Sequence, residues 1–174
     1  MIEVRNVYKS FNGKEVLKNI SFTFEAGKTN LIIGQSGSGK TVLMKSVIGI
    51  HQVDKGQILY NGRDFTKMTS KEVALLRQEI GMLFQGSALF DSMTVEENVR
   101  FPLEMFSNKT RKEWEKRVAF CLDRVGLSHA AKLFPSEISG GMQKRAAIAR
   151  AIVLEPTYLF CDEPNSGLDP KTSL

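Results

Sequence analysis

The chain has 174 residues, the size of one domain or of one domain cut short. With 42% hydrophobic and 25% charged residues, the composition is that of a globular protein and excludes a disordered or fibrous chain. No apolar run approaches the roughly 20 residues that a membrane-spanning helix needs. The N-terminus lacks the layout of a secretion signal. Cys121 and Cys161 are far apart and form no CxxC pair, which argues against a disulfide framework or a zinc site.

The net charge of +5 is modest and spread along the chain. In the densest stretch, from Lys109 to Arg117, basic residues alternate with acidic ones, which is typical of a solvated helix face. This distribution does not favour a polyanion site, so no nucleic-acid partner is expected.

The first third of the chain predicts strands followed by a helix. Asn12-Gly13 lies between apolar-patterned runs, and both residue types tolerate the positive φ of a hairpin turn. Leu31-Ile32-Ile33 is apolar on both faces, as in a strand covered by helices on each side. The elements expected here are strands at Ile2–Tyr8, Glu15–Leu17, Asn19–Phe24 and Asn30–Ile33, a helix at Lys40–Ile50, and a strand with its turn at Gln57–Gly62.

Helices alternate with short strands in the rest of the chain. Two capping boxes, Thr69 to Glu72 and Thr94 to Glu97, predict helix starts, and Gly126 is typical of the position after a helix end. The helices expected are Val73–Ile80, Asn98–Phe106, Trp114–Val125 and Gly141–Val153, with strands at Gly81–Gln85 and Thr157–Cys161. This alternation predicts an α/β domain with a mostly parallel sheet.

A glycine-rich loop follows the fourth predicted strand. Its residues, Gly34, Gln35, Ser36, Gly37, Ser38, Gly39, Lys40 and Thr41, match the phosphate-binding pattern GxxxxGK[ST]. The glycines let successive N–H groups point inward at phosphate, and the start of the next helix adds partial positive charge. Lys40 is expected against the β- and γ-phosphates, and Thr41 offers its hydroxyl to Mg²⁺. The loop predicts a nucleoside triphosphate with Mg²⁺ as its ligand.

A pair of carboxylates follows the last predicted strand. Asp162 and Glu163 come directly after an apolar run, so we expect them at a sheet edge beside the phosphate loop. Asp162 would hold magnesium, directly or through water, and Glu163 would orient or deprotonate the attacking water. An acidic pair alone is usually a cap or a solvated turn. Together with the loop it indicates a nucleoside triphosphatase.

A third motif, Ile138-Ser139-Gly140-Gly141-Met142, precedes a basic helix. It resembles the LSGGQ signature of ATP-binding cassette (ABC) ATPases, and Ser139, Gly140 and Gly141 are expected to form an anion-binding cap at the helix start. The resemblance covers essentially the whole chain. It implies an α/β P-loop NTPase fold with an ABC-type antiparallel β subdomain, a parallel core sheet and a helical subdomain. The expected division is a nucleotide-binding core at 1–85 and 154–174 with a helical subdomain at 86–153.

The resemblance implies roles for further residues. Gln85 stands where the family has its Q-loop glutamine, which reaches the metal and the water while sensing a transmembrane partner. Phe11 stands where the family places a ring that stacks on adenine, although the ring could instead be part of the core. Ser166-Gly-Leu-Asp169 resembles the D-loop, which crosses the dimer interface.

Two stretches narrow the resemblance within the family. Residues 81–103 and 131–142 look like the Mla-type ATPases, which energise phospholipid transport in Gram-negative envelopes. This implies a phospholipid transporter, and another importer or exporter stays open. The apolar tip Ala88-Leu-Phe90, followed by Met93, would supply the groove for a permease's coupling helix. Alternatively, these side chains pack into the helical subdomain.

The family's mechanism implies two incomplete sites that close on each other. Lys40, Thr41, Gln85, Asp162 and Glu163 of one subunit would hold Mg-ATP. Ser139 and Gly141 of a second copy would close over the γ-phosphate. The expected partners are therefore a second copy of the chain and a transmembrane permease subunit. The implied location is peripheral, on the cytoplasmic face of the inner membrane.

The end of the sequence departs from the family pattern. Asp169-Pro170 predicts a helix start, but the sequence stops at Leu174, before the family's switch histidine and later strands. We therefore expect a truncated product that binds nucleotide poorly or hydrolyses it slowly, and that buries its open sheet edge by self-association. The alternatives are a soluble ABC ATPase acting on nucleic acid or ribosomes, and a binding-only module.

Overall fold

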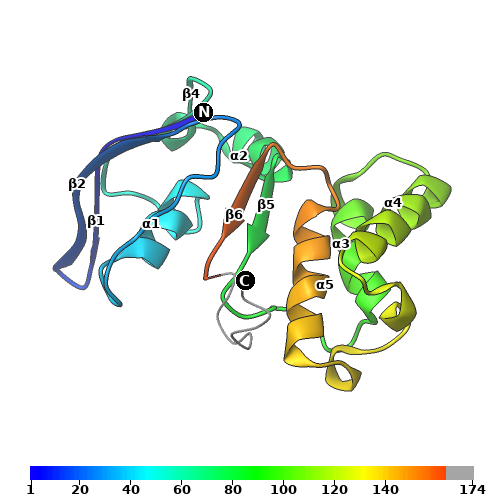
Figure 1. Cartoon of the computed structure of the whole chain (residues 1–174). Helices are drawn as coiled ribbons and strands as arrows, with labels where there is room; N and C mark the ends of the chain where they lie inside the picture. Colours follow the sequence, from blue (N-terminus) through cyan, green and yellow to red (C-terminus); the bar gives the residue numbers. More distant parts are fainter. Residues whose placement is uncertain (164–174) are drawn as a thin grey trace. The chain divides into compact units, whose positions relative to one another are not determined.

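The computed structural model describes residues 1–163, so the predicted D-loop, Ser166 to Asp169, lies outside the described residues. The chain divides into two compact units, Met1–Arg77 and the part that begins at Gln78 (Figure 1). The division predicted from the sequence, with a helical subdomain at 86–153, stays a prediction.

The first unit contains an antiparallel sheet with strand order β2-β1-β3-β4. The Asn12-Gly13 turn is confirmed, because both residues have positive φ, 48° and 78°, as a tight hairpin requires. The elements of this unit are β1 (Ile2–Phe11), β2 (Lys14–Phe24), α1 (Lys40–Val47), β3 (Lys55–Tyr60), β4 (Arg63–Asp64), the short 3₁₀ helix Phe65–Lys67 and α2 (Ser70–Gln78).

The sheet buries one face together with α1. Ile58 and Tyr60 of β3 are almost fully buried, as is Val47 of α1. The Tyr60 hydroxyl donates a 2.8 Å hydrogen bond to the Val47 carbonyl, so the last turn of α1 is attached to the sheet. The helix is shorter than predicted because Gly49 adopts a φ of 75°, which ends the helical path. This packing determines where α1, and the loop before it, can lie within the unit.

The predicted strand Asn30–Ile33 is wrong. These residues form neither a strand nor a bridge, and the side chains of Leu31 and Ile33 are 79% and 84% exposed. A strand exists only where a neighbour completes its hydrogen-bond ladder. Among residues 1–163, none pairs with this segment. Its apolar composition is therefore not sufficient to make it a strand.

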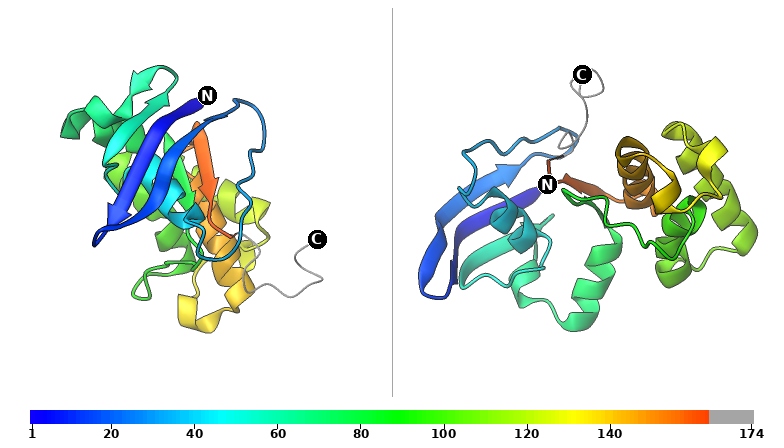
Figure 2. Two further views of the ribbon diagram at one scale, coloured as in Figure 1. Left: turned by 90° about the vertical axis from the view of Figure 1, so that its left-hand side faces the viewer. Right: turned by 90° about the horizontal axis from the view of Figure 1, so that it is seen from below.

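The second unit combines a parallel strand pair with a cluster of helices (Figure 2). The strands β5 (Ile80–Leu83) and β6 (Tyr158–Cys161) pair in register, with Ile80 opposite Tyr158 and Leu83 opposite Cys161. The helices are α3 (Val95–Phe106), α4 (Arg111–Arg124) and α5 (Gly140–Ile152), with short 3₁₀ helices at Ser128–Ala130 and Pro135–Glu137. Among residues 1–163, the α/β fold class is thus confirmed, with an antiparallel and a parallel sheet. The expectation of a mostly parallel sheet is wrong for these residues, because four strands pair antiparallel and two pair parallel.

Between residues 78 and 163, the three helices share one apolar core. Its buried members include Val95, Val99, Leu103, Val118, Leu122, Leu127, Ala146 and Ala149. The capping box at Thr94 and Glu97 is confirmed, but α3 begins directly after Thr94, three residues before the predicted start. A further capping box, Thr110 to Glu113, starts α4 and was missed in the sequence, although it has the same pattern.

The end of α5 lies against β5. A Cβ atom on Gly81 would come within 2.3 Å of the Ala151 carbonyl oxygen, so only glycine permits this approach. From α4, the Arg117 guanidinium donates to the carbonyls of Ile152 and Val153 at 2.7 and 3.0 Å, which satisfies the end of α5. Helix α5 is therefore held at its C-terminal end by a strand and by a neighbouring helix. Within residues 1–163, no helix combines the length and apolarity that crossing a bilayer requires.

Candidate functional site

The glycine-rich loop, residues 34–41, connects an exposed segment to the first turn of α1. Gly37 and Gly39 adopt φ angles of 77° and 95°, which glycine accepts without steric cost. The Lys40 ammonium donates to the carbonyls of Gly34 and Gln35 at 2.8 and 2.9 Å. The loop therefore curls around the lysine, and its cation faces the backbone of its own loop.

Two glycines of the loop lie close to neighbouring atoms. A Cβ on Gly34 would come within 2.8 Å of Ser38 Oγ, and one on Gly39 would come within 3.1 Å of Val16 Cγ1 on β2. Residues 34–38 are exposed, and the amides that open α1 follow at once. Exposed amides, a lysine cation and a helix start together suit a polyphosphate. The residues present thus fit the triphosphate predicted from the sequence.

Phe11 lies at the end of β1, where its side chain is partly exposed. Its ring meets His51 edge to face at a centroid distance of 5.1 Å, and the Lys9 ammonium lies 5.2 Å from the ring centroid. Lys9 is in turn held by Asp54 at 2.9 Å. The ring is therefore positioned at the surface and not in the core, and its stacking on adenine stays a prediction.

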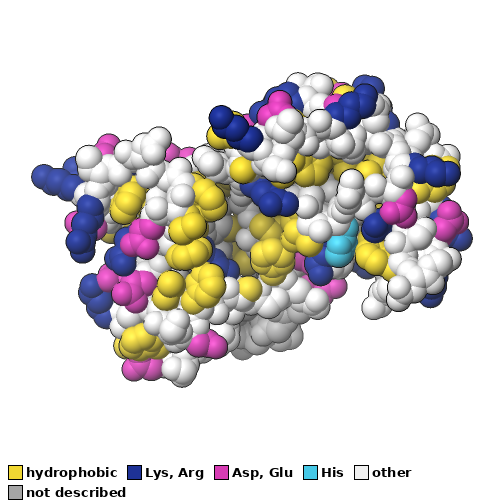
Figure 3. Space-filling model, turned by 180° about the vertical axis from the view of Figure 1, so that it is seen from behind, with side chains coloured by type: hydrophobic (Ala, Val, Ile, Leu, Met, Phe, Trp, Pro, Cys, Tyr) yellow, Lys and Arg dark blue, Asp and Glu magenta, His cyan; other side chains and the backbone are white. Residues whose placement is uncertain are grey.

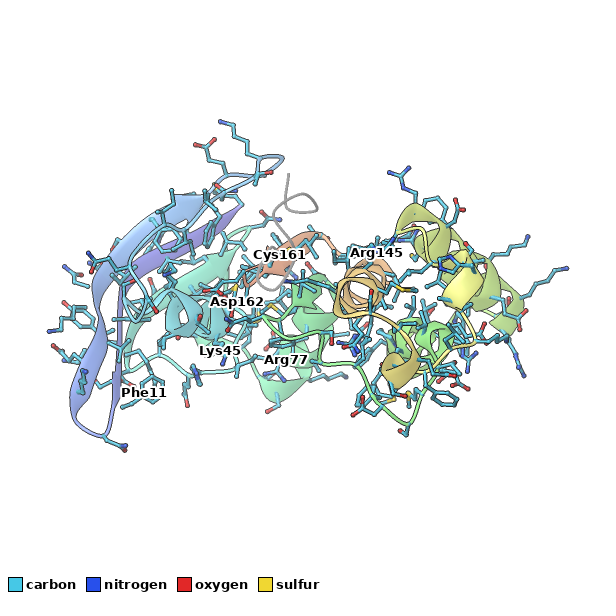
Figure 4. The ribbon with its side chains drawn as sticks, turned by 60° about the horizontal axis from the view of Figure 1, so that its bottom comes forward. Phe11, Lys45, Arg77, Arg145, Cys161 and Asp162 are labelled. Carbon is cyan, nitrogen blue, oxygen red and sulfur yellow. The ribbon has the colours of Figure 1, made fainter. Side chains whose placement is uncertain are left out.

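Asp162 follows β6 directly. Its backbone N–H donates to the Leu83 carbonyl at 2.9 Å, so the parallel ladder continues one residue beyond the strand. Only 9% of the residue is exposed. Figure 4 labels Asp162 and its neighbour Cys161 at the end of β6. Asp162 therefore lies at the end of the parallel strand pair, as predicted, while its predicted location beside the phosphate loop stays a prediction.

Glu163 makes two contacts that sequence reasoning did not predict in this form. Its carboxylate oxygen Oε2 accepts a 2.8 Å hydrogen bond from Gln85 Nε2, and its backbone carbonyl accepts one from Lys144 Nζ at 3.3 Å. Its φ is 49°, which is uncommon for a residue with a side chain. The structure thus brings the predicted Gln85 and Glu163 together and adds Lys144 of α5 to the group.

The loop that follows Gln85 is held by α5. The Arg150 guanidinium donates to the carbonyls of Ser87 and Ala88 at 2.9 and 2.8 Å. Burial lowers the pKa of Arg150, which is the expected effect of removing a cation from water. Ala88 has a φ of 48°, so this part of the loop has a defined, uncommon conformation. Arg150 was part of the basic helix in the sequence, but no local pattern indicates that it reaches this loop.

The same loop is held from α3 by Asn98. This side chain is fully buried and accepts from the Phe90 amide at 2.7 Å. Its own amide donates to the carbonyls of Phe90, Met93 and Thr94 at 3.0 Å each. Sequence reasoning missed this residue. The sequence does contain a signal for it: an asparagine lies on the apolar face of α3, between Val95 and Val99, where a buried polar side chain needs a partner.

The apolar tip of the loop, residues 88–90, shows features of both predicted roles, a surface for a permease and packing into the helices. Leu89 packs against the core of the helices. Phe90 is 43% exposed and contacts the Phe101 ring at 5.0 Å. The loop therefore presents one aromatic side chain outward and uses another apolar side chain for packing.

The signature motif forms the start of α5. Ser139 is the N-cap, and its hydroxyl accepts from the Met142 amide at 3.3 Å. The helix begins at Gly140, where a Cβ would meet nothing within 4 Å. The first turn of α5 therefore has free space next to Gly140. The predicted helix start is confirmed to within one residue, and anion binding by Ser139, Gly140 and Gly141 stays a prediction.

Several of the charged side chains form ion pairs. On the face that Figure 3 shows, basic and acidic side chains are interspersed. On α4, Arg111 pairs with Glu115 at 3.3 Å, and Arg117 pairs with Glu155 at 3.5 Å. This pairing supports the interpretation of the dense stretch as a solvated helix face.

Comparison with known proteins extends this picture. The family described as ABC transporter matches residues 17–166 of the chain. The probable ribonucleotide transport ATP-binding protein mkl of Mycobacterium leprae is 43% identical over 169 residues, which cover 97% of this chain and 49% of that protein. The methionine import ATP-binding protein MetN of Clostridium tetani is 39% identical over 173 residues, which cover 99% of this chain and 54% of that protein. The chain spans about half the length of these curated relatives.

Solved structures share the fold. The ATP-binding cassette MJ0796, in a dimeric post-hydrolysis state bound to ADP and Pi, superposes with a TM-score of 0.90 at 30% identity, covering 99% of this chain and 78% of that one. The cbiO1 protein of Clostridium perfringens, part of the transporter complex cbiONQ, superposes with a TM-score of 0.88 at 31% identity. The match covers 99% of this chain and 68% of that one. The family match, the sequence relatives and the shared fold agree with the motifs in the two units. The chain belongs to the ABC transporter family, and its fold is that of the family's ATP-binding cassette.

Proposed function

We propose that the chain is the ATP-binding subunit of an ABC transporter, which binds and hydrolyses Mg-ATP as a dimer to drive transport across the inner membrane. The observation that carries the proposal is the hydrogen bond between Gln85 and Glu163, directly beside Asp162. It groups an amide and two carboxylates at one strand edge, as ATP hydrolysis requires. The family match supports the proposal independently.

The loop 34–41 binds the phosphates in this proposal. Its amides and the start of α1 donate to phosphate oxygens, and Lys40 exchanges its bonds to the Gly34 and Gln35 carbonyls for bonds to phosphate. Phe11 stacks on the adenine, since an exposed, positioned ring offers a face to a planar base.

Thr41, Gln85 and Asp162 hold the magnesium ion in this proposal. They offer a hydroxyl, an amide oxygen and a carboxylate, the hard oxygen ligands that Mg²⁺ prefers. When bound, the ion neutralises charge on the phosphates.

Glu163 acts as the general base. Its carboxylate accepts the proton of the attacking water, while Gln85 orients that carboxylate through its 2.8 Å bond.

A second copy of the chain completes the site in this proposal. Ser139 and Gly141, at the open first turn of α5, close over the γ-phosphate held by the other copy. The dimeric state named for MJ0796 supports this assembly. A transmembrane permease receives the movement near Gln85, at the loop that exposes Phe90. The chain then works on the cytoplasmic face of the membrane.

Phospholipid is the cargo that we propose, on the resemblance of residues 81–103 and 131–142 to the Mla-type ATPases. Two relatives are named for ribonucleotide and methionine transport. The intact transporter in detergent micelles, with each cargo added separately, decides between these cargoes. ATP turnover should rise with phospholipid as the offered cargo and stay at its basal level with ribonucleotide or methionine. Stimulation by either of the other two would reassign the cargo and leave the ATPase proposal intact.

The substitution Glu163→Gln tests the proposed hydrolysis. It keeps the shape of the side chain but removes the base, so ATP binding should persist, turnover should fall at least a hundredfold, and an ATP-bound dimer should accumulate. Size-exclusion chromatography with ATP and a phosphate-release assay measure both effects. Glu115→Gln on the exposed side of α4 is the matched control. Wild-type turnover in Glu163→Gln would show that Glu163 is not the base.

A further inference from the structure

Lys144 is a buried cation near the candidate active site. It lies on α5 with 6% of its surface exposed, which is rare for lysine unless the ammonium has a partner. Its Nζ donates to the backbone carbonyl of Glu163 at 3.3 Å. A charged donor on a carbonyl stabilises that carbonyl's orientation more strongly than a neutral donor does. Lys144 therefore acts on the peptide group of the proposed base.

Glu163 needs such support because of its backbone. Its φ of 49° is in the left-handed region, which costs energy for any residue with a Cβ atom. Such a conformation persists only where surrounding contacts determine it. Two contacts do so here, since Lys144 binds the carbonyl and Gln85 binds the carboxylate. The direction of the side chain depends on the backbone conformation, so the carbonyl contact also aims the carboxylate.

The helix that carries Lys144 also carries the signature motif. Helix α5 begins at Gly140 with Ser139 as its cap, so Lys144 lies about one turn into the helix. One rigid helix thus joins the signature motif to the peptide group of Glu163. A displacement of the start of α5 would move the Lys144 ammonium and disturb the orientation of Glu163.

We propose that Lys144 is a positioning residue for ATP hydrolysis, which holds Glu163 in its left-handed conformation and so aims the carboxylate at the attacking water. The inference is based on the proposed ATPase function. It assigns Lys144 no contact with nucleotide. Its loss should therefore lower kcat and leave the KM for ATP unchanged, because nucleotide binding depends on other residues.

Three variants of the full chain test the proposal in a steady-state phosphate-release assay. Lys144→Met keeps the length of the side chain and removes the charged donor, and kcat should fall about tenfold or more with a KM for ATP within about twofold of wild type. Lys144→Arg restores a charged donor and should recover most of kcat. Arg145→Met is the matched control on the same helix (Figure 4), because Arg145 donates instead to the Val125 carbonyl at 2.9 Å. The control should keep the wild-type kcat.

A double-mutant cycle separates positioning from a general loss of structure. If Lys144 acts through Glu163, adding Lys144→Met to Glu163→Gln should lower the residual turnover no further. Equal kcat values for Lys144→Met and wild type, or multiplicative effects in the cycle, would overturn the inference while the ATPase proposal stands. A wild-type protein without ATP turnover, alone and with its permease, would overturn both. A KM for ATP that rises while kcat is unchanged would also reject a positioning role.

Discussion

Gln85 and Glu163 are 78 residues apart in the chain and are joined by a 2.8 Å hydrogen bond from Nε2 to Oε2. The parallel strands explain the contact. Leu83 and Cys161 are the last paired residues of β5 and β6, and Gln85 and Glu163 each lie two residues further on. Because the two strands run in the same direction and in register, both residues leave the sheet at the same edge. The proposed base and its orienting amide are thus set by strand register.

The substitution Gln85→Glu tests this contact through pH dependence. It replaces a donor to Glu163 by a second carboxylate, and a like charge at this distance raises the pKa of one member of the pair. A base must be deprotonated to act, so the acid limb of the kcat profile should move to higher pH by about one unit or more. The profile is measured between pH 5 and 9, and the exposed Gln52→Glu serves as the control. An unshifted acid limb would contradict the role of Gln85 at Glu163.

Removal of the loop cation should weaken nucleotide binding. Lys40 makes two charge-assisted bonds within its own loop, and we propose that it gives the same kind of bond to phosphate. Such a bond contributes about 1.5–3 kcal/mol, so Lys40→Ala should weaken ATP binding on the order of ten- to a hundredfold. Titration with a fluorescent ATP analogue measures the change. Lys45→Ala, in the last turn of α1, should bind like wild type. Equal affinities for the two variants would remove Lys40 from the site.

The buried amide of Asn98 should be important for stability. Asn98→Leu leaves the Phe90 amide and the carbonyls of Phe90, Met93 and Thr94 without this partner. Unsatisfied buried groups cost about 1–3 kcal/mol, so the free energy of unfolding should fall by about 3 kcal/mol in urea denaturation. Asn108→Leu, at an exposed position, should change it by less than about 0.5 kcal/mol. If both variants unfold alike, the bonds of Asn98 do not contribute net stability.

Carboxylates at the helix caps and at Asp54 should make the free energy of unfolding depend on pH in the acid range. The Thr94 backbone amide and hydroxyl donate to Glu97 and lower the pKa of its carboxylate, and the Thr110 hydroxyl and amide lower the pKa of Glu113 likewise. The pKa of Asp54 is lowered by its bonds to Lys9 and Ser10. A pKa below that of the unfolded chain gives stability that is present above about pH 4 and is lost as pH falls through the lower folded value.

Unfolding in urea between pH 2.5 and 6 measures this dependence. The free energy of unfolding should decrease as the pH falls below about 4. Glu97→Gln removes one titrating group and should decrease less steeply, while Glu115→Gln should follow the wild-type curve. The same slope for Glu97→Gln and wild type would show that this cap does not contribute.

The sequence alone determined the features that depend on neighbours a few residues apart. The Asn12-Gly13 turn, the capping box at Thr94 and the start of α5 at Ser139 each involve contacts within about four residues. Local patterns are sufficient here, because the interacting groups are already joined by a short piece of chain. The phosphate loop belongs to this class, since its curl comes from its own glycines and from Lys40.

The tertiary structure alone decided the contacts between distant segments. The apolar run Leu31–Ile33 has the composition of a strand but finds no ladder partner among the described residues. Conversely, Lys144 and Arg150 look like ordinary members of a basic helix, and only folding places them on the Glu163 carbonyl and on the loop after Gln85. Residue type determines what a side chain can bond. Which partner it meets depends on strand register and helix packing, which bring together groups that are far apart along the chain.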